Sequence, residues 1–437
     1  MTDLRIGYLV QQFPPEVGAG PGRVLEMSSR WQEAGAEVTV VTGMPNRPQG
    51  RIYDGYRNRI WMEERKPEWG NLRVLRSWLY ASPLGGFART LLNNVTFMVT
   101  GALSALFRMP RVDVLIASSP PFFPHVAGVL AARLRGFPLV LEVRDLWPDY
   151  LVGMGVLHAE GVAAKALFDL ERLLLRQADA VVVVTESFAR RMGEKGVPPE
   201  RIHLVPNGVD TALYHPADEP APFPEMAKAH SGMDGSSPQG SRDSHLVVGY
   251  LGNFGAGQGL EYVVEAARMV EQDLAPEASG GEGAGIRFVL AGDGPERERL
   301  EAQVRSAGIT NMSIHGPIPK SQTRAFYNAC DLCLVPLAPV AVFQETIPSK
   351  IFEVLACGRP VLGAMGGEGA RVVELAQAGW VVAPGDPRAL ADQVLAFRGL
   401  PWEARKDVGA TGPGWVAEHY GRPALAARYL EILASLP

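Results

Sequence analysis

Two carboxylates and a lysine lie close together in the segment FQETIPSKIFEVLACGRPVL, residues 343–362. Glu345 and Glu353 are eight positions apart, and Lys350 lies between them. Pro348 suits the first position of a helix, so the N–H groups around it lack helical partners. A lysine beside such groups can bind an anion, and a carboxylate accepts hydrogen bonds from vicinal hydroxyls. The segment therefore suits a nucleoside diphosphate, unless Lys350 and Glu353 only pair with each other.

A glycine-rich loop after the first predicted strand is also suited to an anion. Gly18, Gly20 and Gly22 lie in this loop, which opens a predicted helix. Glycines let a ligand approach the backbone closely. The glycine spacing differs from a dinucleotide-binding fingerprint, so nicotinamide and flavin cofactors are disfavoured. The alternative is a plain turn.

Two similar loops occur in the C-terminal half. Residues 252–259 read GNFGAGQG and include Asn253 and Gln258. Asp293 follows a later strand, where it either accepts a hydrogen bond from a ligand or caps a helix that begins at Pro295.

Charged residues end the predicted strand FPLVLEVRD, residues 137–145. A strand buried on both faces leaves Glu142, Arg144 and Asp145 in need of partners or a ligand. Arg144 and Asp145 are therefore candidates for contact with a ligand, unless Arg144 only pairs with Glu142 or Asp145 and holds the loop. No D-x-D sequence occurs in the chain, so a carboxylate pair that grips a metal is not indicated.

The 437 residues alternate short apolar, β-branched runs with helical patterns. Such runs indicate parallel sheets between helices, and the length favours two domains. We expect an α/β protein with two doubly wound Rossmann-like domains that face each other across a cleft. The first domain spans 1–208 and takes in a C-terminal helix at about 414–437. The second spans 209–413 and has a flexible Pro/Ser/Gly-rich insertion at about 215–245.

Twelve strands are predicted from these runs. They lie in residues 5–10, 36–43, 112–119, 137–145, 178–186 and 201–208 of the first domain, and in residues 245–252, 286–292, 312–316, 331–337, 359–365 and 379–384 of the second.

Charge narrows the choice of partners. The net charge of −5 excludes a generally basic nucleic-acid binder. Residues 51–111 nevertheless contain ten Arg or Lys against four Asp or Glu, together with Trp61, Trp69 and Trp78. The uncharged stretch Thr90–Phe107 ends this segment. We expect the segment to bind an anionic membrane surface, with a core helix and a solvated basic loop as the alternative.

Cysteine usage and the N-terminus indicate the compartment. Cys330, Cys333 and Cys357 do not make a disulfide framework, and the C-x-x-C pair lies in an apolar run where cysteine acts as a small hydrophobe. No signal peptide opens the chain, because MTDLRIGYLV lacks a basic region and a long apolar region. We expect a cytoplasmic protein, peripheral on the inner face of the cell membrane.

Taken together, these residues resemble the retaining family-4 glycosyltransferases, whose E-x7-E motif Glu345 and Glu353 match. The resemblance covers nearly the whole chain outside the insertion. Several segments look like the branch of N-acetyl-L-fucosamine transferases of surface-polysaccharide assembly. They read FPPEVGAGPGR, EVTVVTGMPNRPQGRIYDGY, ASSPPFF, EVRDLWPD, VPNGVD, GNFGAGQGLE and IPSKIFEVLACGRPV.

The resemblance implies a GT-B fold, no cofactor, no required metal, and a nucleotide-sugar donor held mainly by the second domain. Glu353 would bind the ribose hydroxyls, Glu345 would contact the donor sugar, and Lys350 would hold the diphosphate. The catalytic set would be Glu345, Lys350, Arg144 and Asp145. The remaining donor-binding groups would come from Thr346, Ile347, Ser349, Gly18, Ala19, Gly20, Asn253, Gln258 and Asp293.

The chain departs from its family at two places. Many relatives neutralise the diphosphate with Arg and Lys in the loop after the second domain's first strand, where this chain has Asn253 and Gln258. Lys350, Arg144 and helix dipoles would then carry more of that task. Arg144 and Asp145 fall where many relatives have a histidine–aspartate pair, so a general base at position 144 is not expected.

The expected reaction is retaining transfer of a sugar, such as N-acetyl-L-fucosamine, from a UDP-sugar to a polyprenyl-diphosphate-linked or other glycan acceptor. The acceptor oxygen would attack the face that the nucleotide leaves, and stabilisation of the leaving group would be the main catalytic effect. Two alternatives remain: a non-hydrolysing UDP-sugar 2-epimerase, and a nucleotide-sugar-binding scaffold without catalysis.

Overall fold

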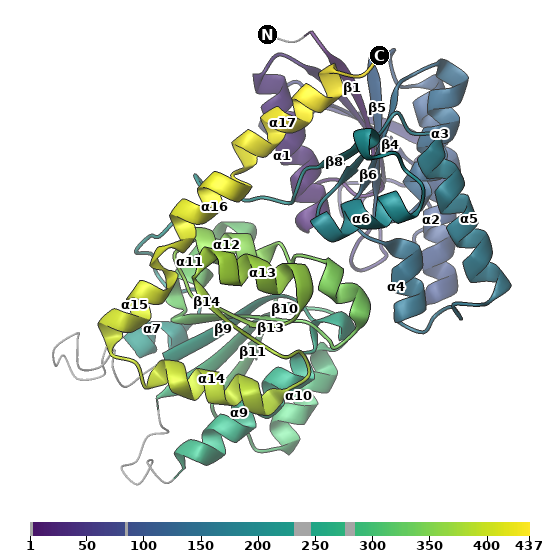
Figure 1. Cartoon of the computed structure of the whole chain (residues 1–437). Helices are drawn as coiled ribbons and strands as arrows, with labels where there is room; N and C mark the ends of the chain where they lie inside the picture. The colour runs from purple at the N-terminus through teal and green to yellow at the C-terminus, as the bar shows by residue number, and fades with distance from the viewer. Residues whose placement is uncertain (1–2, 84–85, 231–245, 276–284) are drawn as a thin grey trace. The chain divides into compact units, whose positions relative to one another are not determined.

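The computed structural model describes residues 3–83, 86–230, 246–275 and 285–437, which form two compact units (Figure 1). Unit 1 comprises Met1–Asn207 and Arg422–Pro437, and unit 2 comprises Gly208–Gly421. Each unit contains one sheet, and helices cover both of its faces. This is the doubly wound α/β architecture that the alternation of apolar runs and helical patterns predicts.

The sheet of unit 1 has eight strands in the order β3-β4-β2-β1-β5-β6-β7-β8. The strands are β1 (Arg5–Leu9), β2 (Glu37–Gly43), β3 (Trp61–Glu64), β4 (Arg73–Ser77), β5 (Val114–Ser119), β6 (Leu139–Val143), β7 (Ala180–Val183) and β8 (Ile202–Leu204). All pairings are parallel except that of β3 with β4. The six predicted strands of this domain are confirmed.

Strands β3 and β4 are present but were not predicted. They lie inside the basic segment 51–111, with β3 at the edge of the sheet and β4 beside it, and they carry Glu63, Glu64, Arg73 and Arg76. Arg76 pairs with Glu64 at 2.5 Å, and Arg73 pairs with Glu63 at 2.8 Å. These ion pairs between β3 and β4 therefore neutralise part of the positive charge of segment 51–111.

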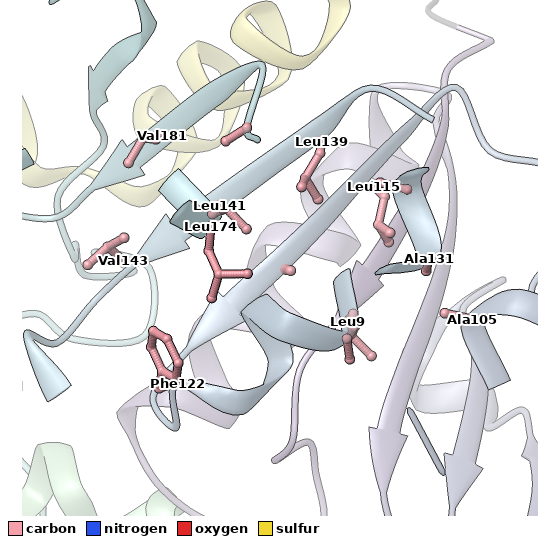
Figure 2. Close-up of a cluster of buried hydrophobic side chains, with 14 of the residues drawn as sticks. Leu9, Ala105, Leu115, Phe122, Ala131, Leu139, Leu141, Val143, Leu174 and Val181 are labelled. Atoms are coloured by element: carbon pink, nitrogen blue, oxygen red, sulfur yellow. The ribbon is translucent and has the colours of Figure 1, made fainter. Parts of the chain in front are cut away.

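Seven helices surround this sheet in the described part of unit 1. They are α1 (Ala19–Glu33), α2 (Phe87–Phe107), α3 (Phe123–Arg135), α4 (Trp147–Gly153), α5 (Val162–Arg176), α6 (Glu186–Glu194) and α17 (Arg422–Ala434). On one face, Leu115 and Leu141 of the sheet pack with Ala131 of α3 and Leu174 of α5 (Figure 2). Fully burying a leucine contributes about 1.5–3 kcal/mol.

The opposite face of the unit 1 sheet is covered by α1 and α17. Trp31 of α1 donates from Nε1 to the carbonyl of Ala426 at 3.0 Å, and its ring meets Tyr429 edge-on at 5.2 Å. The part of the C-terminus that belongs to unit 1 begins at Arg422, not at about 414. Residues before it stay in unit 2, because Tyr420 stacks on Phe352 with ring centroids 4.4 Å apart.

Unit 2 has a six-stranded parallel sheet in the order β11-β10-β9-β12-β13-β14. Its strands are β9 (Leu246–Asn253), β10 (Ile286–Asp293), β11 (Met312–His315), β12 (Leu332–Pro336), β13 (Val361–Ala364) and β14 (Gly379–Val382). All six match predicted strands. Two predicted donor-binding residues, Asn253 and Asp293, are the last residues of β9 and β10.

The helices of unit 2 lie on both faces of that sheet. They are α7 (Pro224–His230), α9 (Leu260–Leu274), α10 (Arg297–Ser306), α11 (Lys320–Ala329), α12 (Lys350–Ala356), α13 (Gly367–Ala376), α14 (Pro387–Arg398), α15 (Trp402–Ala410) and α16 (Gly412–Tyr420), with the short 3-10 helices η3 (Ala256–Gln258) and η4 (Ala341–Glu345). Helices α7, α11, α12, α13 and α16 enclose one core, and α9 and α14 enclose the other.

The prediction of a flexible insertion at about 215–245 is wrong for its first half. Met226 of α7 is fully buried, and Glu219 pairs with Arg324 at 2.7 Å. The buried Met226 side chain and this ion pair thus hold the first half of the segment against the rest of unit 2, although the segment contains prolines. Residues 231–245 lie outside the described residues.

Candidate functional site

Helix α12 places Lys350 and Glu353 one turn apart at the end of the unit 2 sheet. The helix begins at Lys350, with Ser349 as its N-cap, and ends at Ala356. It begins two residues after Pro348, the residue expected at its first position. Gly358 adopts a φ of +66°, which ends the helix, since glycine takes a left-handed conformation without steric cost.

The side chain of Lys350 turns toward β9 and η3. Its Nζ lies 3.9 Å from the ring centroid of Tyr250 and donates to Oε1 of Gln258 at 3.4 Å. Burial lowers the pKa of Lys350 to about 7, and the nearby Glu353 carboxylate only partly offsets this effect. An anion bound beside this amine would favour its charged form.

Glu353 has different partners from Lys350. Its Oε2 accepts from the hydroxyl of Tyr327 at 3.0 Å. Burial raises the pKa of Glu353, although Tyr327 and Tyr214 lower it by hydrogen bonding. Among the described ion pairs, none joins Lys350 to Glu353, so the alternative in which the two side chains only pair with each other is wrong. The carboxylate and the amine are both held in place for other contacts.

The backbone before α12 is partly committed to internal hydrogen bonds. The N–H and the side-chain hydroxyl of Thr346 both donate to the carbonyl of Phe343, at 3.3 Å and 3.0 Å. The expectation of an unpaired N–H at Thr346 is therefore wrong, because η4 ends by turning that N–H inward. In the part of the chain that the structure describes, the N–H groups of Ile347 and Ser349 have no partner. Glu345 is the last residue of η4.

Asn253 and Asp293 are adjacent at the carboxyl edge of the unit 2 sheet. They end β9 and β10 and are paired in register. Asp293 accepts from the N–H of Gly294 at 2.9 Å, whereas α10 begins at Arg297 with Glu296 as its N-cap. The alternative in which Asp293 caps this helix is thus wrong.

The predicted site residues of unit 1 form a second group. Helix α1 begins at Ala19, so Gly20 lies in its first turn and not in the preceding loop; Gly18, the N-cap, has a φ of +154°. A Cβ at Gly20 would lie 3.1 Å from Nη1 of Arg144. The Arg144 guanidinium is therefore packed directly against the start of α1.

Arg144 is also tied to the end of β6. Its Nε donates to the carbonyl of Ser119 at 2.8 Å and lies 3.6 Å from Oε2 of Glu142. The alternative pairing of Arg144 with Glu142 is thus confirmed. The structure brings Arg144 to the glycines of α1, with most of its side chain buried.

Glu142 is the centre of a buried polar network that the sequence did not reveal. It accepts from the hydroxyls of Tyr8 and Ser118 at 2.7 Å and 2.6 Å, and from Arg23 at 3.1 Å. Arg23 also donates to the carbonyl of Pro206, near the end of the first part of unit 1, at 2.8 Å. The sequence indicated that Glu142 needs a partner, but Arg23 lies 119 positions away and no local pattern links the two residues.

Asp145 is the titratable candidate of unit 1. It is partly buried, and burial raises its pKa to about 6. A carboxyl with this pKa can exchange a proton near neutral pH. His125 does not take that role: it is buried against the carbonyl of Glu142, and burial lowers its pKa to about 4.

No metal site is found among the described residues, in which no cluster of three or more His, Cys, Asp or Glu could hold an ion. Cys330, Cys333 and Cys357 are free and buried, and burial raises the pKa of Cys330 and Cys357. A pocket with about 330 Å³ of open space lies beside η4. It is lined by Leu337, Ala338, Pro339, Val340, Phe343, Gln344, Met365, Gly366 and Pro384, so it does not include Lys350 or Glu353.

Comparison with known proteins assigns a family to both units. Residues 19–208 match a glycosyl transferase 4-like domain, and residues 245–398 match the glycosyl transferases group 1. The two matches together cover most of the chain.

Individual relatives agree with these matches. WbjE of Pseudomonas aeruginosa, named as a glycosyltransferase, is 28% identical over 65% of this chain and 66% of its own length, just under two thirds. WcaI of Escherichia coli K12, named for glycosyl transfer in colanic acid biosynthesis, is 27% identical over 79% of each chain.

The solved structure of HepE from Anabaena, in complex with UDP and glucose, has the same fold. It is 17% identical and superposes with a TM-score of 0.68 over 99% of this chain and 100% of HepE. A likeness at this identity establishes architecture and not chemistry. The chain therefore belongs to the family-4 glycosyltransferases and folds as a GT-B protein.

Proposed function

We propose that this glycosyltransferase moves a sugar from a UDP-sugar to a glycan acceptor with retention of the anomeric configuration. The observation that carries the proposal is the arrangement at α12. An amine with no carboxylate pair and a carboxylate held by tyrosines lie within one turn of each other. An anion and a diol can bind there side by side, as a nucleoside diphosphate requires.

In the proposed mechanism, Glu353 accepts from the ribose hydroxyls and Lys350 contacts the diphosphate. Glu345 faces the donor sugar, and the N–H groups of Ile347 and Ser349 supplement Lys350. Positive charge on Lys350 stabilises the departing nucleotide, which is the main catalytic effect in such a reaction. We assign Arg144 and Asp145 to the acceptor side of the reaction, without a role for Arg144 as a base.

Two comparisons support the choice of substrates. The HepE structures contain UDP, and one contains UDP-glucose. WcaI is named for colanic acid biosynthesis, which supports a role in polysaccharide assembly. We further propose that the transferred sugar is an N-acetylated deoxyhexosamine such as N-acetyl-L-fucosamine, and that the acceptor is linked to polyprenyl diphosphate.

We propose that unit 1 binds the membrane that carries this acceptor, because α2 is apolar on its outer side. The helix buries Asn93, Asn94 and Ser104 but leaves Val99 50% exposed and Phe107 74% exposed. By length and composition alone, α2 is the one described helix that could cross a membrane, which is weak evidence for spanning. Contacts with the unit 1 core favour a helix that lies on the surface of the bilayer.

Helix α3 extends the same surface. It packs against α2 and exposes Leu130 and Leu134. Neither helix contains Asp or Glu, while Arg108 and Arg133 are exposed. Apolar side chains beside arginines match an anionic lipid surface. Trp69 does not contribute, since it is buried against Phe13 in the core. We accordingly propose a peripheral location on the inner face of the cell membrane.

Incubation of the full chain with a panel of UDP-sugars, with and without lipid-linked glycans, tests the proposal. Transfer only in the presence of acceptor, with release of UDP, is the expected result. NMR of the product gives the anomeric configuration, and inversion would refute the retaining mechanism. An epimerised UDP-sugar without acceptor would instead support the 2-epimerase alternative.

A further inference from the structure

Lys350 is held by two residues that are distant from it along the chain. Tyr250 lies in β9 and Gln258 ends η3, whereas Lys350 begins α12. Nζ lies 3.9 Å from the centroid of the tyrosine ring and 3.4 Å from the glutamine Oε1. A cation–π contact and a hydrogen bond thus fix the amine at the carboxyl end of β9.

The orientation of the Gln258 amide follows from the ammonium that it faces. The hydroxyl of Tyr250 lies 3.1 Å from Gln258 Oε1 and 2.7 Å from the backbone carbonyl of Asn253. The hydroxyl has a single proton, and the nearer carbonyl, which can only accept, takes it, so Lys350 is the donor to Oε1. Because an ammonium group only donates, Gln258 must present its oxygen to Lys350.

The space that the amine occupies exists because residue 252 is a glycine. A Cβ at Gly252 would lie 2.6 Å from Nζ of Lys350 and 3.3 Å from its Cε. The φ of Gly252 is +156°, a backbone conformation that L side chains rarely adopt. The φ value favours glycine where the lysine crosses the end of β9, and a side chain at position 252 would displace the flexible end of Lys350.

A cation at position 258 would conflict with this arrangement. A lysine there would bring a second ammonium close to Nζ of Lys350, and like charges a few ångströms apart repel each other. The neutral Gln258 instead attracts the amine. An ammonium has three donors, and Gln258 is its one hydrogen-bond acceptor among the described residues, so donors remain for an anion.

From this geometry, and resting on the proposed function, we infer that Tyr250 and Gln258 are positioning residues that direct Lys350 at the diphosphate of the donor. One lysine from α12 thereby replaces the basic residues that the loop 252–259 lacks. Gln258 acts by positioning Lys350, and its side chain must be neutral for the lysine to occupy this position.

Isothermal titration calorimetry with UDP tests this inference on the full chain. Uridine serves as the probe without phosphate, and inorganic diphosphate as the probe without a nucleoside. The variants are Lys350→Ala, Tyr250→Phe, Gln258→Lys and the double variant Lys350→Ala/Gln258→Lys. Tyr262→Phe on α9 is the matched control for loss of a tyrosine hydroxyl, and thermal unfolding verifies that each variant is folded.

Lys350→Ala is expected to weaken UDP binding by about tenfold or more and to leave uridine binding unchanged, since a charge-assisted bond is lost. Tyr250→Phe should weaken UDP binding about threefold, and Tyr262→Phe should not. Gln258→Lys should strengthen UDP binding far more in the Lys350→Ala background than in the wild-type background, because the new amine then has no competitor. Equal effects of Gln258→Lys in both backgrounds would overturn the inference.

The probes separate this inference from the proposed function. If the wild type and Lys350→Ala bind UDP equally well, the inference is overturned and the donor assignment stands. Protein that binds inorganic diphosphate through Lys350, but not UDP, overturns the donor and leaves the positioning residues standing. Binding of neither probe overturns both.

Discussion

At the scale of single residues, Glu353 and Lys350 of α12 can have separate roles because each charged group has its own partners. Glu353 is held by the hydroxyl of Tyr327, and Lys350 by the ring of Tyr250. A salt bridge between the two would have cancelled both charges. Their separation leaves a hydrogen-bond acceptor and a hydrogen-bond donor about one helical turn apart.

Glu353→Gln is expected to raise the donor KM by about 10-fold to 100-fold, because a hydrogen bond to a charged group contributes about 1.5–3 kcal/mol. Steady-state kinetics over a range of donor concentrations measure this effect. The amide keeps an oxygen for Tyr327, so folding should be preserved. Glu403→Gln, at an exposed position in α15, is the control and should leave KM unchanged. An unaltered KM in Glu353→Gln would refute the ribose contact.

Binding of UDP-glucose should weaken as the pH rises through 7. Burial lowers the pKa of Lys350 to about 7 in the free protein, whereas a bound diphosphate favours the charged amine. The lysine is therefore charged at pH 6 and largely neutral at pH 8, and affinity should fall about tenfold between these values. Calorimetry at several pH values measures the change, and the doubly esterified diphosphate of UDP-glucose does not titrate in this range.

Glu353 and Tyr250 are titratable groups close to Lys350, and burial raises the pKa of both. Lys350→Arg shows whether the pH dependence of UDP-glucose binding comes from these groups or from the lysine, because a guanidinium stays charged throughout this pH range. This variant should bind UDP-glucose with little dependence on pH. A slope that persists in Lys350→Arg would assign the titration to another group.

At the scale of elements, the start of α1 and the end of β6 are joined by buried charges. Arg23 and Arg144 both approach Glu142, and the Glu142 side chain has no exposed surface. Arg23 also binds the carbonyl of Pro206. One carboxylate therefore links the glycine-containing helix start, the end of a central strand and the segment where the first part of unit 1 ends.

Glu142→Ala is expected to lower the free energy of unfolding of unit 1 by about 3–5 kcal/mol, because it leaves two arginines without their buried partner. Urea unfolding followed by circular dichroism measures this difference. Asp169→Ala removes the exposed pair with Arg172 and should cost less than about 1 kcal/mol. Equal stability of the two variants would show that the buried network does not hold unit 1 together.

At the scale of the whole molecule, the outer surface of α2 is the proposed site of membrane binding. Sedimentation with anionic phosphatidylglycerol vesicles should recover the wild-type protein. Leu103→Glu/Phe107→Glu should reduce binding at least tenfold, since burying each side chain contributes about 1.5–3 kcal/mol. Both side chains are exposed, so the fold should tolerate the change.

Leu375→Glu is the matched control for that experiment. Leu375 is 57% exposed on α13 of unit 2, outside the proposed membrane surface. This variant should sediment like the wild type. Equal sedimentation of all three proteins would contradict the membrane surface, and it would leave glycosyl transfer itself unaffected.

Local patterns in the sequence determined the architecture of this protein and the residue types of its site. Apolar β-branched runs predicted twelve strands of two parallel sheets, because a strand buried on both faces leaves a clear local signal. The strands β3 and β4 escaped prediction, since glutamates and arginines interrupt their short sequences and remove that apolar signal. Glu345, Lys350 and Glu353 were found for a similar reason, as they lie within nine consecutive residues.

Only the tertiary structure decided what those residues contact. Tyr250 and Lys350 lie 100 positions apart in the sequence, and only the parallel sheet brings β9 beside β12 and the start of α12. The same holds for Arg23 and Glu142, for the inward N–H of Thr346, and for the burial of Trp69. Residue type and local spacing reveal which chemistry is available. Partners, burial and pKa depend on contacts between segments that are distant in the chain, and no local pattern encodes them.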